Sequence, residues 1–136
     1  MRLSTKGRYA VSAMFDLVCF ARNYPISAKE ISERQKIPLF YLEQILLRLK
    51  KKALVKAIKG PAGGYLLAKN PKKITIGEII EAADAPVALA KCIPYASVCL
   101  KSGCCSTRKL WESLSKKFSK ILRSITLADL CEGRMK

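Results

Sequence analysis

Four of the six cysteines in this chain fall within one short segment, at Cys92, Cys99, Cys104 and Cys105. Six residues separate Cys92 from Cys99, five separate Cys99 from Cys105, and Cys104 directly precedes the last. Thiolates are soft ligands that bind zinc, copper(I) and iron–sulfur clusters. This segment is therefore the candidate chemical site of the chain, and we expect a soft metal centre there.

Three kinds of thiol chemistry fit this segment. Zinc sites favour cysteines separated by roughly two to four residues, and only Cys99 and Cys104 have such a gap. Wider gaps on a loop suit an iron–sulfur cluster, which presents several metal atoms to the thiolates. In the third alternative, two of the four thiols form a disulfide under oxidation, and nearby cations such as Lys101 and Arg108 favour the reactive thiolate.

The other two cysteines, Cys19 and Cys131, stand alone in segments with helical periodicity. Small buried thiols on helices more often pack against neighbours than bind a metal. We expect both to be packing residues.

The chain contains no histidine, which excludes serine–histidine and cysteine–histidine catalytic pairs and imidazole metal ligands. Asp16, Asp84 and Asp129 lie in separate segments, and no glycine-rich loop is placed to bind phosphate. We predict that the protein is not an enzyme and has no small-molecule substrate.

Twenty-six Lys and Arg residues against 10 Asp and Glu give a net charge of +16. These cations recur along the whole chain, which favours a folded protein with a polyanionic partner, nucleic acid first and a membrane surface second. Charged residues interrupt the first 24 positions, so we expect neither an export signal nor a membrane span. The prediction is a cytoplasmic protein with reduced thiols.

Hydrophobic periodicity predicts a first helix over 5–23 and a third over 39–52. Between them, Ser27 and Glu30 form a capping box that opens a short second helix. The turn at Ile37–Pro38 joins the second and third helices into a candidate helix-turn-helix.

Two short strands, 54–59 and 65–69, flank the glycine-rich turn 60–64 and predict a wing directly after the third helix. Further helices are predicted over 75–83, 106–124 and 127–130, and a loop over 87–105. The apolar stripe of the long helix is wide, so we expect it to pair with a second copy of the chain.

The fold class is therefore mostly α with a small β wing. We expect a winged helix-turn-helix DNA-binding domain over 1–86, a cysteine-rich loop over 87–105, and a dimerisation helix with a C-terminal tail over 106–136.

The third helix is the predicted recognition helix. Tyr41, Gln44 and Arg48 would approach base edges, because glutamine pairs bidentately with adenine and arginine with guanine. Lysines would contact phosphates, although the run Lys50–Lys52 could also be a solvated helix end that complements the helix dipole. The full set of predicted DNA contacts is Arg2, Phe40, Tyr41, Gln44, Arg48, Lys51 and Lys59.

Several stretches closely resemble the bacterial winged-helix iron–sulfur regulators of the IscR/NsrR type. They are MRLSTKGRYAV at 1–11, ISERQ at 31–35 with YLEQIL at 41–46, GPAGGYLL at 60–67 and ITLADL at 125–130. The resemblance covers nearly the whole chain. It implies a homodimeric transcription factor that binds a double-stranded DNA operator.

The resemblance also implies a [2Fe–2S] or [4Fe–4S] cluster held by Cys92, Cys99 and Cys105, with Cys104 as a candidate fourth ligand. The chain departs from the family pattern here: the cluster-biogenesis regulators place a histidine where it has Arg108, and the nitric-oxide sensors place an aspartate where it has Arg8. The implied function is to sense redox state, nitric oxide or iron–sulfur status. A metal-free thiol-switch regulator and a zinc-stabilised nucleic-acid-binding protein are the alternatives.

Overall fold

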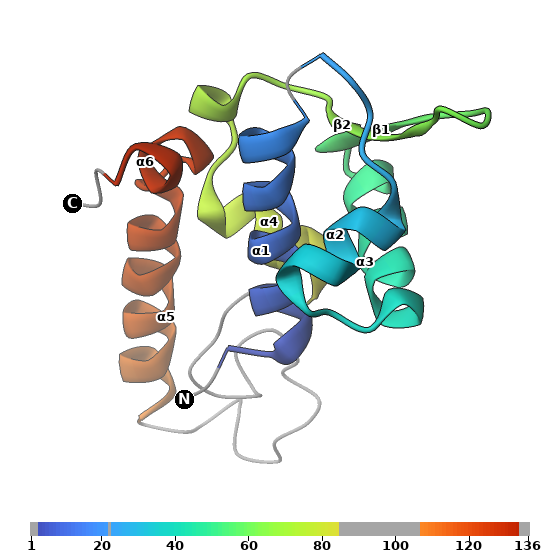
Figure 1. The fold of residues 1–136 in the computed structure, drawn as a ribbon. Helices are drawn as coiled ribbons and strands as arrows, with labels where there is room; N and C mark the ends of the chain where they lie inside the picture. The colour runs from blue at the N-terminus through green and yellow to red at the C-terminus, as the bar shows by residue number, and fades with distance from the viewer. Residues whose placement is uncertain (1–2, 22, 85–106, 134–136) are drawn as a thin grey trace.

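A computed structural model describes residues 3–21, 23–84 and 107–133. The predicted cysteine loop 87–105 and Arg2 lie outside the described residues. The elements, in chain order, are α1 (Thr5–Phe20), α2 (Ala28–Gln35), α3 (Leu39–Lys51), β1 (Val55–Ile58), β2 (Gly64–Leu67), the 3-10 helix η1 (Pro71–Lys73), α4 (Ile76–Ala83), α5 (Arg108–Arg123) and α6 (Leu127–Glu132) (Figure 1). The predicted fold class, mostly helical with a small β wing, is confirmed.

The central helix of the fold is α1, against which α2, α3, α4 and α6 all pack. The Ser4 side chain accepts a hydrogen bond from the Gly7 N–H and so caps its first turn. Ala10, Met14 and Leu17 are buried on its apolar stripe. The helix ends at Phe20, earlier than predicted, because the chain must extend before Pro25.

The helix-turn-helix consists of α2 and α3. The predicted capping box is present, with the Ser27 and Glu30 side chains each bonded to the other's backbone N–H. The turn begins at Lys36, which adopts a left-handed conformation with φ 55°, one residue before the predicted break. Leu42, Ile45, Leu46 and Leu49 point into the core, whereas Leu39, the first residue of α3, is 40% exposed.

The wing is an antiparallel hairpin in which Val55 pairs with Leu67 and Ile58 with Gly64. A third segment joins it, because the Ile26 and Tyr65 backbones exchange hydrogen bonds of 3.1 and 2.7 Å. Gly64 makes this approach possible: a Cβ there would lie 2.4 Å from the Ile26 carbonyl group. The wing is thereby attached to the segment that leads into α2.

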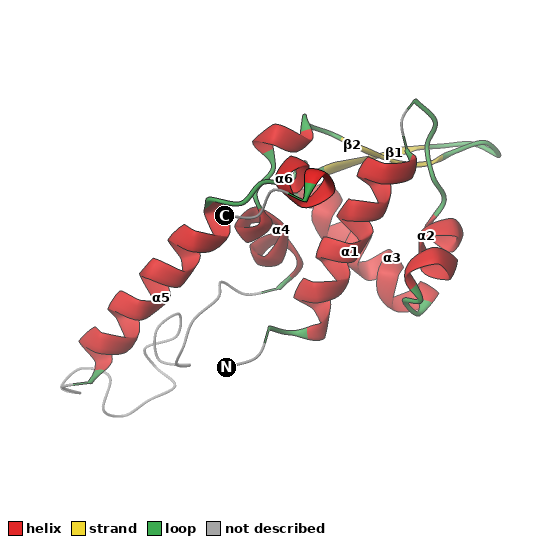
Figure 2. Cartoon of the chain, turned by 60° about the vertical axis from the view of Figure 1, so that its left-hand side comes forward, coloured by secondary structure: helices red, strands yellow, loops and turns green. Residues whose placement is uncertain are grey.

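The C-terminal helix α6 belongs to the same core as the helix-turn-helix. Thr126 pairs with Thr75 in a β-bridge at the start of α4, and the Leu127 N–H donates to the Ile74 carbonyl at 2.8 Å. The Leu127 side chain is fully buried. By contrast, α5 packs mainly on α4, and it extends away from the rest of the fold (Figure 2).

Candidate nucleic-acid interface and cysteine segment

The outward face of α3 carries one exposed stripe. Phe40 is 73% and Leu47 52% exposed, and Gln44 and Lys51 are exposed between and beyond them. These positions recur every three or four residues, so their side chains share a face of the helix, opposite the buried leucines. The sequence prediction included Phe40, Gln44 and Lys51 but missed Leu47, although its spacing from Gln44 marks the same face.

Tyr41 lies at the edge of this stripe and is held by α1. Its ring meets that of Tyr9 edge-on, with the centroids 5.6 Å apart and the planes at 90°. Lys6, also on α1, lines a shallow hollow with Tyr41, Gln44 and Arg48. Lys6 is therefore a cation beside the recognition face that the sequence prediction did not include.

Arg48 connects α3 to the end of α4. Its Nη1 donates a hydrogen bond of 2.7 Å to the Ala83 carbonyl oxygen, the last carbonyl of α4. An arginine at a helix C-terminus both satisfies a free carbonyl and complements the helix dipole. One donor of the predicted base contact is thus already used within the fold. The chain leaves α4 at this point toward the cysteine segment.

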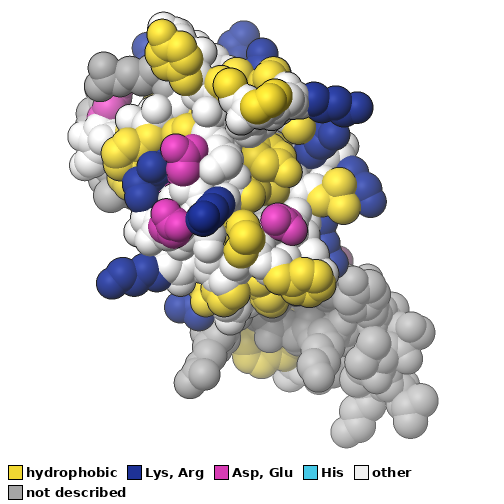
Figure 3. Space-filling model, turned by 45° about the vertical axis from the view of Figure 1, so that its right-hand side comes forward, with side chains coloured by type: hydrophobic (Ala, Val, Ile, Leu, Met, Phe, Trp, Pro, Cys, Tyr) yellow, Lys and Arg dark blue, Asp and Glu magenta, His cyan; other side chains and the backbone are white. Residues whose placement is uncertain are grey.

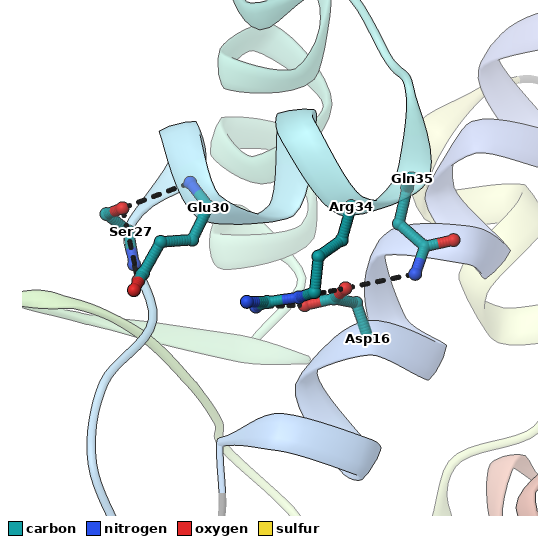
Figure 4. A network of polar contacts seen from close by, with 5 residues as sticks. All are labelled: Asp16, Ser27, Glu30, Arg34 and Gln35. Atoms are coloured by element: carbon teal, nitrogen blue, oxygen red, sulfur yellow. Dashed lines mark hydrogen bonds and ion pairs between the residues drawn. The ribbon is translucent and has the colours of Figure 1, made fainter.

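A buried ion pair fixes α2 on α1 (Figure 4). Asp16 is fully buried, and its carboxylate accepts hydrogen bonds from Arg34 Nε at 3.0 Å and Nη2 at 2.9 Å and from Gln35 Nε2 at 3.0 Å. The Arg34 guanidinium also lies 4.4 Å above the centre of the Phe20 ring. The hydrogen bonds to Asp16 raise the pKa of Arg34 above its usual value.

Cations surround the side of the molecule that carries α2, α3 and the wing. Figure 3 shows Lys and Arg side chains around this face, with Asp and Glu nearer its middle. Lys51 at the end of α3 and Lys59 beyond β1 are both exposed. Exposed lysines beside a recognition helix suit contacts to a phosphate backbone.

Cys19 on α1 and Cys131 on α6 lie on two helices that pack against each other. Both are free, partly exposed thiols, while Cys92, Cys99, Cys104 and Cys105 lie outside the described residues. Burial and the neighbouring Cys19 raise the pKa of Cys131 to about 11. Within the described ranges, no group of three or more Cys, Asp or Glu side chains is placed to hold a metal ion.

The helix α5 leaves its apolar stripe uncovered. Leu110 is 51%, Phe118 41% and Ile121 56% exposed, and Ser115 is the one buried residue of this helix. A stripe of large exposed apolar side chains on a projecting helix marks an interaction surface. No helix among the described residues is both long and apolar enough to cross a membrane.

A helix-turn-helix followed by a hairpin, with an exposed recognition face and a basic surround, defines a winged-helix DNA-binding protein. The family model for Rrf2, described as iron-dependent transcriptional regulator, matches residues 3–133. The HTH-type transcriptional regulator IscR of Yersinia enterocolitica is 44% identical over 139 residues, covering 98% of this chain and 81% of the relative.

Two solved structures agree with this match. T. potens IscR is 37% identical with a TM-score of 0.78, covering 98% of this chain and 88% of that one. CymR (YrzC), the global cysteine regulator of B. subtilis, is 32% identical with a TM-score of 0.79, covering 97% of both chains. The protein belongs to the Rrf2 family and is a transcriptional regulator of the IscR type, which confirms the resemblance. The family consists of regulators rather than enzymes, as predicted.

Proposed function

We propose that this protein is a homodimeric, cytoplasmic regulator that binds operator DNA and responds to oxidants, nitric oxide or iron–sulfur status through a cluster on its cysteine segment. The observation that supports this proposal most directly is the hydrogen bond from Arg48 to the Ala83 carbonyl oxygen. It joins the recognition helix to the last residue of α4, nine residues before Cys92, the first of the four clustered cysteines. A conformational change in the cysteine segment would therefore act on α3 through the hydrogen bond between Ala83 and Arg48.

The donor set fits an iron–sulfur cluster. Cys92, Cys99 and Cys105 are the proposed ligands, and Cys104 is a candidate for the fourth position. Thiolates bind such clusters, and the absence of histidine from the chain leaves sulfur and oxygen donors for the remaining position. When bound, the cluster supplies a group that oxidants and nitric oxide can alter.

A conformational change in the cysteine segment would reach the recognition helix α3 through α4. Its C-terminal carbonyl at Ala83 accepts from Arg48, its N-terminal end is fixed by the Thr75–Thr126 bridge, and its middle is anchored by the buried Ile79. A shift in the chain after Asp84 would then alter the contact with Arg48 while the rest of α4 stays in place. This gives an order–disorder or repositioning switch of the kind that couples a sensor segment to a binding helix.

The proposed DNA contacts follow from the exposed face of α3. Gln44 would contact base edges, with Tyr41 and Phe40 beside it, while Lys51, Lys59 and Arg2 would contact phosphates. Arg48 keeps free donors for a base in addition to its bond with Ala83. Lys6 joins this set as a phosphate contact because it lines the hollow beside Gln44.

The α5 stripe is the proposed dimer interface. Its exposed apolar side chains would be covered by the same helix of a second copy, as expected for a helix-turn-helix protein on a two-fold symmetric operator. The two recognition helices would then be held at a spacing set by the α5 pair.

Replacing Gln44 with alanine should reduce affinity for a DNA sequence selected from a random pool by about 1–3 kcal/mol, because a bidentate amide–base contact is lost. Affinity for random DNA should stay unchanged. Quantitative gel-shift or anisotropy titration at one fixed salt concentration measures both. Random DNA is the internal control, because it keeps the phosphate contacts but lacks the selected base. Equal losses on selected and random DNA would remove Gln44 from base recognition.

Replacing Cys92, Cys99 or Cys105 singly with alanine should abolish iron and sulfide binding by anaerobically purified protein. Each change removes a proposed cluster ligand, and iron and sulfide analysis measures the loss. Cys19→Ala, a cysteine outside the segment, is the matched control and should keep full iron content. Cys104→Ala decides whether that thiol is a ligand. Zinc in place of iron in the wild-type protein would favour the zinc-stabilised alternative.

A further inference from the structure

Phe40 and Leu47 form an exposed apolar pair on the outward face of α3. Phe40 is 73% and Leu47 52% exposed, and because they are seven residues apart, close to two helical turns, both point to the same side. The same helix completely buries Leu42, Leu46 and Leu49, so the core is supplied without the exposed pair. Large apolar side chains exposed together on one face mark an interaction surface.

The polar groups around this pair are arranged as the major groove of DNA requires. Glu43 is exposed four residues before Leu47, and Gln44 lies between the two apolar residues in the chain. Lys51 follows at the end of the helix, and Figure 3 shows hydrophobic side chains on this side of the molecule with cations around its edges. Cations attract phosphates, whereas a carboxylate repels them. The charges therefore place base edges, rather than phosphates, opposite Phe40 and Leu47.

The same charges favour DNA over a second copy of this chain as the partner. Two copies that met through this face would bring their cationic edges together, and like charges in contact oppose association. A DNA duplex offers the opposite arrangement, with bases at the centre of the groove and phosphates along both of its edges.

Thymine is the base whose chemistry fits the apolar pair. Its C5 methyl group is an apolar feature of the major groove, where the other base edges present hydrogen-bond donors and acceptors. The side chains of Phe40 and Leu47 cannot form hydrogen bonds, so packing either against a donor or acceptor would leave that polar group unsatisfied. Packing against a methyl group instead removes apolar surface of both partners from water.

We propose that Phe40 and Leu47 are specificity-determining residues, each of which contacts the C5 methyl group of a thymine in the major groove. This inference rests on the proposed binding of operator DNA by α3, and it names the base that the apolar residues select.

The two contacts would fall about three base steps apart when α3 lies along the groove. Seven residues advance an α-helix by about 10 Å, and successive base pairs are about 3.4 Å apart. Gln44 would meet the base pairs between them, and its amide suits adenine. The buried leucines and the 2.7 Å hydrogen bond from Arg48 to Ala83 hold α3 in the fold, so the spacing is set by a fixed helix.

Uracil substitution measures the methyl contacts directly. DNA that binds the full-length protein is first selected from a random pool, with the anaerobically purified and the metal-free protein in parallel. Deoxyuridine then replaces each thymidine of the selected half-site in turn, which removes only the C5 methyl group. In anisotropy titrations at one fixed salt concentration, we expect affinity to fall about three- to fivefold at each of two positions, about three base steps apart.

Two variants assign these positions to side chains. Leu47→Ala should remove the response to uracil at one position and Phe40→Ala at the other, while each variant keeps the response at the remaining position. Both side chains are exposed and alanine favours a helix, so both variants should fold. Leu39→Ala is the matched control, because Leu39 is 40% exposed on α3 but lies to the side of this face, and it should keep both responses.

Three results would overturn the proposal while leaving DNA binding in place. The first is equal affinity for thymine and uracil at every position, and the second is a uracil response that persists unchanged in both Leu47→Ala and Phe40→Ala. The third is a lower molecular mass of the double variant in light scattering without DNA, which would make this face a contact between copies of the chain. Failure to select any DNA sequence would instead overturn the proposed function, and this inference with it.

Discussion

Replacing Arg34 with alanine is expected to lower the free energy of unfolding by about 3–5 kcal/mol, because it leaves the Asp16 carboxylate buried without its counter-ion. Asp16 is fully buried and would keep only the Gln35 amide as a side-chain partner. Chemical denaturation measures the change, and the melting temperature should fall by about 10–20 °C. Operator binding should weaken in parallel, because the ion pair that holds α2 against α1 is then lost.

Removing the other partner of the ion pair, with Asp16→Ala, should lower the free energy of unfolding by less, about 1–3 kcal/mol. The side chain of Arg34 is already 33% exposed, so its charge can be hydrated. Lys29→Ala, on the same helix but exposed, is the matched control and should change stability by less than about 0.5 kcal/mol. A loss in Arg34→Ala no larger than in Lys29→Ala would contradict the role of the ion pair.

Changing Phe118 and Ile121 together to lysine is expected to convert the protein to a monomer. Both side chains are exposed, 41% and 56%, so the protomer should still fold, whereas two charges on the apolar stripe would block its burial against a second copy. Sedimentation or light scattering should give the mass of one chain. Operator affinity should fall by about 10³-fold or more, toward the non-specific level, because only one half-site is bound at a time.

The matched control for this interface is Lys117→Ala with Lys120→Ala, two changes to exposed cations on the same helix. That variant should remain dimeric, since its apolar stripe is intact. A double-lysine variant that keeps the dimer mass and full operator affinity would remove α5 from the interface and would require another surface to join two copies.

Local sequence signals predicted most of the helices and strands, because capping and hydrophobic periodicity depend on residues that are close in the sequence. The capping box at Ser27–Glu30 marked the start of α2 in the sequence, and hydrophobic spacing marked α3 as a helix. A second capping box, Thr75–Glu78, sets where α4 begins in the structure. The end of α1 and the 3-10 helix at Pro71–Lys73 were missed. Both lie in connecting segments, whose conformation depends on what the neighbouring elements require.

The contacts that organise the site are long-range and could not be predicted from one sequence. Asp16 and Arg34 are 18 residues apart, and Arg48 and Ala83 are 35 apart. Nothing in their local pattern indicates that they meet. Asp16 appeared in the sequence as an isolated acidic residue in a helix, and its burial becomes evident only when α2 is placed on α1.

Cys131 shows the same limit. Its helix, predicted as a short terminal element, packs on α1 and into the main core through Leu127. Hydrophobic periodicity identified α6 as a helix but gave no information about which element it would contact. The wide apolar stripe seen in the sequence is exposed on α5, and its pairing with a second copy stays a prediction.

The most direct test of the central claim is the visible absorption spectrum of anaerobically purified protein, with iron, acid-labile sulfide and zinc counted on the same sample. A regulator of the proposed kind should be brown, with iron and sulfide bound and with both lost in Cys92→Ala. A colourless protein that holds zinc or no metal, even after reconstitution with iron and sulfide, would contradict a cluster-based sensor and leave thiol chemistry at the clustered cysteines as the signal.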